Sequence, residues 1–235
     1  MELKRIIVLA NSIKKRARCV AGIEVRTGKQ LAPAGWIRPV SGESEGELEL
    51  RHMRVEGGGP VAVLDIMDVP LTQYAKDPIH PEDWIVDTSQ RWTRAGTFDP
   101  KTLATLEEEP KDLWLESTSD TDRVTGAFLT QRTKHQSLYL IRPENLRVRL
   151  WREFKGYNRK KTRAVFNYRD AEYSLGLTDP LTTDRYRLPF PDVDKPPNEI
   201  PLPCADKYLL CVSLTPLYKP TGYHYKVVAT VLELP

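Results

Sequence analysis

The sequence contains few cysteines and histidines, and none of them stands in a familiar ligand or disulfide pattern. Its three cysteines, Cys19, Cys204 and Cys211, form no CxxC pair, and its four histidines form no HxxxH pair. Such a sparse, odd cysteine count argues against a disulfide scaffold and against a thiolate zinc site. We therefore expect no metal, no cofactor and a reducing, cytoplasmic compartment.

Long apolar runs are also missing. No run approaches the roughly 20 residues that are needed to cross a bilayer, so we expect no membrane partner. The apolar stretch Ile6-Ile7-Val8-Leu9 is too short for a signal peptide. Its β-branched residues instead predict a buried strand.

Glycine, with 13 residues, is less frequent than proline, with 19. Because proline is tolerated at strand edges and turns but not inside helices, this ratio favours a loop-rich β architecture. Short apolar runs between turn signals predict four or five strands in the first ~70 residues, which is typical of a small barrel or sandwich. Six further runs predict strands between Ser137 and Leu234.

The middle of the chain differs from both ends. Asp99 followed by Pro100 is a good helix start, and residues 101–108 favour a helix. The run Glu107-Glu108-Glu109 makes this region locally acidic. We interpret it as a connector with short helices, whose acidic part at 99–122 could dock a basic protein.

Positive charge is concentrated between residues 134 and 169. This segment holds eleven Lys and Arg residues but only two acids, Glu144 and Glu153, and six aromatic residues are interleaved with them. Cations that neutralise phosphates release counterions, and aromatic side chains stack on unpaired bases. The segment therefore predicts a nucleic-acid groove, for which the alternative is an ordinary solvated strand face. The expected contact residues are Arg147, Arg149, Lys160, Lys161 and Arg163.

Two of these cations fall within a short alternating stretch. In Leu146-Arg147-Val148-Arg149-Leu150-Trp151, apolar and basic residues alternate along the chain. This period of two predicts a strand with one buried face and one cationic face.

Carboxylate pairs that could hold a nuclease metal are scarce. Asp65 and Asp68, at the end of a predicted strand, are the best candidates, with Asp179 as a third. No Lys or His partner accompanies them at a nuclease spacing, so a turn or cap role is favoured. Since no complete catalytic constellation is present, binding is favoured over catalysis.

Stretches at both ends of the chain resemble a known family. The first are Leu9-Ala10-Asn11-Ser12-x-Lys14-Lys15-x-x-Arg18-Cys19-Val20-Ala21-Gly22 and Gly35-Trp36-Ile37-Arg38-Pro39-Val40-Ser41. The others are Phe166-x-Tyr168-x-x-x-x-Tyr173-x-Leu175-x-Leu177-Thr178-Asp179-Pro180, Cys211-Val212-Ser213-Leu214 and Gly222-Tyr223-His224-Tyr225-Lys226-Val227-Val228-Ala229. Together they resemble the bacterial dual OB domain-containing proteins, which are associated with defence against invading nucleic acid.

The resemblance implies a mainly β fold with two small OB-like β-barrels. We expect the barrels at 1–75 and 134–235, joined by the short, partly helical acidic connector at 76–133. It also implies binding or sensing of nucleic acid or nucleotides, and it carries no catalytic residues over. The matching positions with phosphate-contacting, stacking or base-reading chemistry are Asn11, Ser12, Lys15, Arg18, Trp36, Arg38, Tyr168, Thr178, Asp179, Ser213, Tyr225 and Lys226.

Three functions are compatible with these patterns. The first is a non-catalytic module that binds single-stranded nucleic acid or a nucleotide signal in a basic groove, in bacterial defence. The second is a scaffold that docks a basic protein through residues 99–122. The third is a metal-dependent nuclease built on the three aspartates.

Overall fold

The computed structural model describes residues 2–14, 17–26, 32–43, 46–117, 119–132, 135–154, 157–203 and 207–235. Strands predominate, which confirms the predicted mainly β fold class. The chain divides into two compact units: unit 1 comprises residues 1–106, 132–138 and 235, and unit 2 comprises residues 107–131 and 139–234. None of the helices in the described ranges has the length and apolar character needed to span a bilayer.

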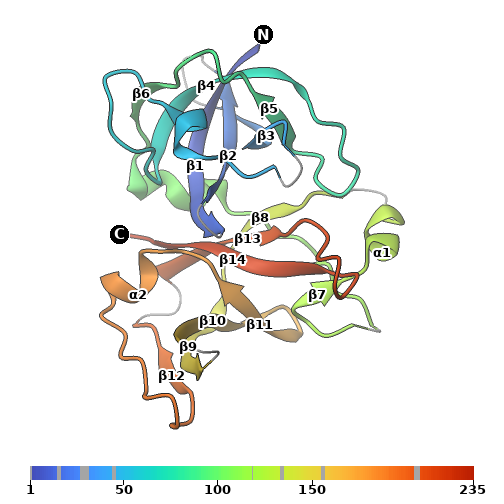
Figure 1. The fold of residues 1–235 in the computed structure, drawn as a ribbon, viewed down its shortest axis with the longest axis vertical. Helices are drawn as coiled ribbons and strands as arrows, with labels where there is room; N and C mark the ends of the chain where they lie inside the picture. Colours follow the sequence, from blue (N-terminus) through green and yellow to red (C-terminus); the bar gives the residue numbers. More distant parts are fainter. Residues whose placement is uncertain are drawn as a thin grey trace. The chain divides into compact units, whose positions relative to one another are not determined.

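Unit 1 is a closed sheet. Its strands are β1 (Glu2–Lys14), β2 (Ala17–Arg26), β3 (Ala32–Val40), β4 (Asp65–Tyr74), β5 (Asp83–Val86) and β6 (Thr93–Thr97). The pairing order β1-β2-β3-β5-β4 returns to β1 because β4 also pairs with β1, and β6 adds to β4 (Figure 1). The pairing of β3 with β5 is parallel, whereas the neighbouring pairs are antiparallel. Five strands closed in this way form the OB-like barrel that the resemblance implies.

The interior of this barrel is apolar. Alternate residues of β1, such as Ile6 and Val8, pack with Ile37, Met67 and other side chains in one buried cluster. On β2, Gly22 lies so close to the Ile7 carbonyl that a Cβ atom would collide with the backbone oxygen. Glycine is therefore required where these two strands approach each other.

Unit 2 repeats the same strand order. Its strands are β7 (Arg123–Val124), β8 (Leu138–Ile141), β9 (Glu144–Phe154), β10 (Asn158–Tyr168), β11 (Ala171–Leu177), β12 (Asn198–Pro201), β13 (Tyr208–Leu214) and β14 (His224–Glu233). Only Arg142 and Pro143 separate β8 from β9, so these two segments form one interrupted first strand. This strand pairs with β10 through β9 and with β13 through β8, which closes the order β9-β10-β11-β14-β13-β8. Again the third and fifth strands, β11 and β14, pair in parallel. The short strand β12 pairs with β9 on the side away from β10, and β7 pairs with the start of β14.

The helices are short. They are η1 (Leu50–Met53), η2 (Pro100–Leu106), α1 (Gly126–Thr130) and α2 (Thr182–Arg185). The helix predicted over 101–108 is the 3-10 helix η2, and Asp99 stabilises its start by accepting a 3.0 Å hydrogen bond from the Lys101 backbone amide. The segment 76–133, predicted as a connector, contributes strands to both units. From it, β5 and β6 join the sheet of unit 1, and β7 joins that of unit 2.

Candidate nucleic-acid interface

The outward face of the first three strands in unit 1 is apolar and buried. Ile7 of β1 lies opposite Ile23 of β2, which lies opposite Trp36 of β3, so the three side chains share one face. All three are buried, and Trp36 is only 7% exposed. The centre of this face therefore offers no exposed ring for stacking. Arg5, two residues from Ile7 on β1, lies on the same face but is paired with Asp68.

Arg38 also has a structural role. Its guanidinium donates to both carboxylate oxygens of Asp83, with Nε–Oδ1 at 2.6 Å and Nη2–Oδ2 at 3.0 Å, and both residues are buried. Burial disfavours the charged guanidinium, but the attraction of Asp83 prevails and raises the pKa of Arg38. Such a pair ties β3 to β5 and leaves Arg38 unsuited to phosphate contact.

The remaining first-barrel candidates are Asn11, Ser12, Arg18 and Lys15. Ser12 is buried, and the partly exposed Asn11 donates from its amide nitrogen to the Val61 carbonyl at 2.7 Å. Arg18 is partly exposed, and its backbone exchanges two hydrogen bonds with Leu48. Lys15 lies outside the described residues. Of the predicted first-barrel set, Arg18 thus keeps a side chain that a ligand could reach.

In unit 2 the corresponding outward face is polar. Along β9, Leu146, Val148 and Leu150 are buried while Arg147 and Arg149 are partly exposed, as the alternation predicts. Side chains that lie opposite each other in an antiparallel pair share a face. Arg149 lies opposite Arg163, and Trp151 lies opposite Lys161. Four of the predicted cations therefore come together on one face: Arg147, Arg149, Lys161 and Arg163.

Carboxylates from distant parts of the sequence partly neutralise this face. Glu199 of β12 binds both Arg147 and Arg149, at 3.1 and 2.7 Å. Glu172 also accepts from Arg147, and Asp122 is held by Arg163. The excess of positive charge on this face is therefore smaller than the excess counted along residues 134–169 of the sequence.

Asp122 is the most enclosed of these acids. Its carboxylate accepts hydrogen bonds from Arg163 and from Arg123, which follows it in the chain. Burial acts to raise the pKa of Asp122, but these hydrogen bonds and the two charges outweigh burial and lower it. Arg163 consequently stabilises the unit as well as adding charge.

Small residues lie beside the cations on β11. Arg163 lies opposite Gly176, and Val165 lies opposite Ser174. A Cβ atom at Gly176 would meet a single neighbour, a Val227 methyl carbon at 3.7 Å. Since no large side chain covers Gly176, the backbone of β11 can be approached closely there.

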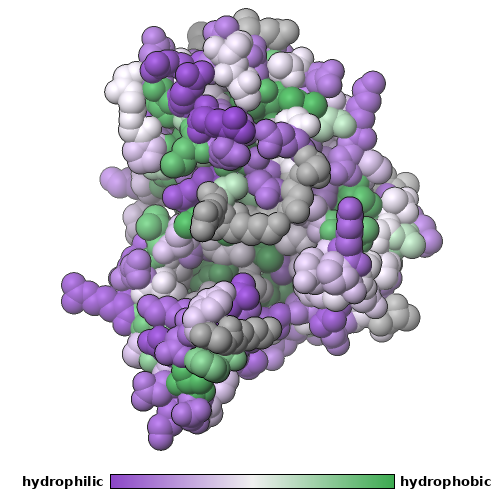
Figure 2. Space-filling model, in the orientation of Figure 1, coloured by the Kyte–Doolittle hydropathy of each residue, from purple (hydrophilic) through white to green (hydrophobic). Residues whose placement is uncertain are grey.

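The loop between β9 and β10 carries two exposed rings. Phe154, at the end of β9, is 68% exposed, and Tyr157, just before β10, is 64% exposed. The lower part of Figure 2, where Figure 1 places β9 and β12, shows hydrophilic residues interrupted by small hydrophobic areas. Rings set among cations in this way suit contact with unpaired bases.

Lys160 lies on the other face of this hairpin. It lies opposite Arg152 and directly precedes Lys161 on β10, so the two lysine side chains alternate between the faces of the strand. The ammonium nitrogen of Lys160 is 4.9 Å from the centre of the Phe190 ring. Arg152 contacts the same ring at 5.8 Å. The side chains of Lys160 and Lys161 therefore lie on opposite faces of the β9–β10 hairpin.

A second aromatic group lies between β13 and β14. Tyr218 and Tyr225 meet edge to face with ring centres 6.0 Å apart. The guanidinium of Arg123 lies 5.7 Å from the ring centre of Tyr223 and 5.6 Å from that of Tyr225. The sequence prediction included Tyr225 but not Arg123 or Tyr218. The local sequence could not indicate Arg123, because the pairing of β7 with β14 brings it there from a distant segment.

Two predicted contact residues are buried elsewhere in unit 2. The Tyr168 hydroxyl donates to the Pro110 carbonyl at 2.7 Å. Lys226 is 1% exposed, and its ammonium nitrogen lies 5.7 Å from the centre of the buried Tyr173 ring. Both belong to the interior of the unit and not to its outer face.

Comparison with known proteins agrees with this architecture. A protein-family model described as a dual OB-containing domain matches residues 4–231. The chain belongs to this family. No curated protein and no solved structure gives a significant match. As a dual OB-containing domain, this chain carries two OB barrels. An OB barrel is a binding module that uses the face of its second and third strands together with the loops that follow its first and fourth strands.

These elements coincide with the polar features of the second OB barrel. Its second strand, β10, carries Lys161 and Arg163, and its third strand, β11, carries the small residues Ser174 and Gly176. The loop after its first strand carries Phe154 and Tyr157, and the loop after its fourth strand carries Tyr218 and Tyr223. The outer surface of β9, β10, β11 and β14 together with these two loops is hereafter the β10–β11 face.

The three aspartates of the nuclease hypothesis are occupied by protein donors. Asp68 binds Arg5 through both oxygens, at 2.6 and 2.7 Å. Asp65 accepts from the Ala62 amide and lies 3.1 Å from Arg94. Asp179 accepts from the backbone of Leu181 and Val231 and from the Thr182 hydroxyl. The contacts of Asp65 and Asp179 are those of turn or cap residues, whereas Asp68 pairs across two strands with Arg5.

The acidic stretch is also used internally. Glu107 accepts two bonds from Arg142 Nε and one from Nη2, and Glu108 accepts from the Leu140 amide. Glu116 accepts from the backbone and the hydroxyl of Thr125. Much of the charge that could attract a basic protein is thereby committed within unit 2.

Proposed function

We propose that the chain is a non-catalytic module that binds single-stranded nucleic acid on the β10–β11 face. The observation that carries this proposal is the pair of exposed rings, Phe154 and Tyr157, at the end of a hairpin whose outward face holds Lys161 and Arg163. Stacking on a ring requires an unpaired base, so a single strand fits this face better than a duplex.

The surrounding charges support backbone contact. Ion pairs with Glu153 at 3.8 Å and with Asp122 position the side chains of Lys161 and Arg163 without covering them, since each remains about one-third exposed. Phosphate can then be drawn to the face while bases reach the rings. In this proposal the ligand is a polymer that spans the loops at both ends of the face, and a mononucleotide is the weaker ligand.

The biological setting follows from the resemblance and from composition. A module that holds single-stranded nucleic acid suits the role in bacterial defence that the resemblance implies. We place it in the cytoplasm because its sparse cysteines suit a reducing compartment. The scaffold alternative has less support, because Glu107, Glu108 and Glu116 are held by contacts inside the unit.

Two adjacent lysines provide a matched test. Lys161→Gln and Lys160→Gln remove the same charge from opposite faces of β10. Fluorescence anisotropy with a labelled mixed-sequence DNA or RNA strand, from 50 to 300 mM salt, measures the affinity and its salt dependence. We expect Lys161→Gln to weaken binding and to reduce the slope of log K against log salt by about 0.7, and Lys160→Gln to have little effect.

Three results would contradict the proposal. The parent protein could fail to bind at 50 mM salt, a duplex could bind as tightly as a single strand, or both variants could bind like the parent. Arg163→Glu is a poor substitute, because it would remove the partner of Asp122 and destabilise the fold.

A further inference from the structure

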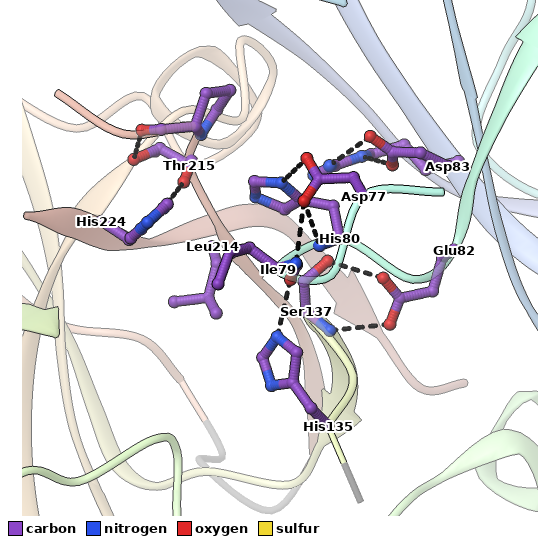
Figure 3. Close-up of polar contacts among 12 residues, drawn as sticks. Asp77, Ile79, His80, Glu82, Asp83, His135, Ser137, Leu214, Thr215 and His224 are labelled. Atoms are coloured by element: carbon purple, nitrogen blue, oxygen red, sulfur yellow. Dashed lines mark hydrogen bonds and ion pairs between the residues drawn. The ribbon is translucent and has the colours of Figure 1, made fainter. Parts of the chain in front are cut away.

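A second polar cluster lies in unit 1, on the segment that leads into β5. Asp77 accepts hydrogen bonds from the backbone amides of Ile79 and His80, at 2.8 and 3.3 Å. Its other carboxylate oxygen lies 3.0 Å from Nδ1 of His80 (Figure 3). The turn therefore holds the imidazole and the carboxylate of Asp77 against each other.

Asp83 completes the cluster. It begins β5, and the bidentate contact with Arg38 fixes its orientation. A carboxylate has about four lone-pair positions, so two hydrogen bonds from Arg38 leave others available. Carboxylates that ligate metals are commonly held by such a second partner.

The three side chains converge within the described part of the chain. One ligand atom each from Asp77, His80 and Asp83 can be chosen so that all lie within 4.8 Å of one another. Ligand atoms around a tetrahedral zinc ion, at bond lengths of roughly 2.0–2.2 Å, are roughly 3.3 Å apart. To hold such an ion, the three ligand atoms would have to approach one another by about 1.5 Å at most.

The charges around this cluster also suit a cation. Asp77 and Asp83 bring two carboxylates to the cluster, and an ordinary aspartate side chain is negatively charged at neutral pH. Arg38 is positive, but the buried Glu82 interacts with it electrostatically as well as Asp83. Glu82 is fixed there by the Ser137 amide and hydroxyl, each at 2.7 Å.

We propose that Asp77, His80 and Asp83 form a binding site for a divalent transition metal, with Arg38 as the partner that orients Asp83. One imidazole nitrogen with two carboxylates favours zinc and its neighbours over magnesium or calcium, which prefer sets made only of oxygen. The spacing Asp-x-x-His-x-x-Asp is neither a CxxC nor an HxxxH pattern, which is why sequence reasoning overlooked it. Bound metal would tie the 77–80 turn to the start of β5.

The test uses the full chain after dialysis against EDTA. Zn²⁺ binding is measured by calorimetry, Co²⁺ by its visible absorption, and the melting temperature by circular dichroism with and without Zn²⁺. We expect one Zn²⁺ per chain and a rise in melting temperature of about 5 °C or more at a hundredfold excess over Kd.

Variants locate the ion. Asp77→Asn keeps an oxygen that can cap the turn but loses the charge, and His80→Ala removes the imidazole. We expect each to weaken Zn²⁺ binding at least tenfold. Asp87→Asn, at a partly exposed aspartate of unit 1 that caps its own turn, should bind like the parent.

Absence of Zn²⁺ binding by the parent, or unchanged binding by a folded Asp77→Asn protein, would overturn the proposal. If His80→Ala fails to fold, Asp77→Asn alone decides. Nucleic-acid binding by the β10–β11 face is measured separately and has no part in this outcome.

Discussion

Replacing the two exposed rings of the β9–β10 loop would test the proposed single-strand interface most directly. Phe154 and Tyr157 are 68% and 64% exposed, so Phe154→Ala and Tyr157→Ala remove little buried surface. We expect each to change the free energy of unfolding by less than about 0.5 kcal/mol. Any loss of binding can then be attributed to the interface.

The expected effect on binding is much larger. Stacking of one base on one ring contributes about 1–3 kcal/mol, and each 1.4 kcal/mol is about tenfold in affinity. Each single variant should therefore raise Kd about 5-fold to 150-fold, and the double variant should approach the product if each ring stacks on its own base. Because no charge is removed, the slope of log K against log salt should stay the same.

The assay is fluorescence anisotropy with the same labelled strand at several salt concentrations. Leu50→Ala is the control, since this side chain of η1 is 71% exposed but lies in unit 1. A folded double variant that binds within twofold of the parent would refute the stacking argument. A reduced salt slope would show that the rings act by positioning cations and not by stacking.

Three further predictions concern the folds of the two units. Gly22→Ala should destabilise the protein by about 1–3 kcal/mol in urea unfolding, because its Cβ atom meets a backbone oxygen, whereas Gly176→Ala should be tolerated; equal stabilities would contradict the strand spacing. Arg38→Ala should cost about 3–5 kcal/mol, since it leaves the carboxylate of Asp83 buried without its cation, and a loss below 1 kcal/mol in urea unfolding would count against it. The pKa of Asp122 is lower in the folded than in the unfolded state. The stabilisation from its ionised carboxylate is therefore present above its ordinary pKa of 3.8 and is lost as pH falls through the lower pKa of the folded state. Asp122→Asn should remove that part of the acid dependence of the melting temperature, and an unchanged pH profile would contradict it.

The sequence by itself determined the class of fold and the local layout of its strands. The alternation from Leu146 to Trp151 predicts which face of β9 is buried, since strand side chains alternate whatever the partner strand is. The family motifs at both ends implied two OB barrels, and the match over residues 4–231 confirms the family. Both inferences need only neighbouring residues or recognisable motifs.

The tertiary structure decided which residues can meet a ligand. Trp36 and Tyr168 have the chemistry of stacking residues, but their strands turn them into buried surroundings. The β9 cations Arg147 and Arg149 receive their carboxylate partners Glu172 and Glu199 from other strands, at sequence separations of 25 and 50 residues. Local composition cannot predict such pairs, because they depend on the register of strands that are far apart in the chain.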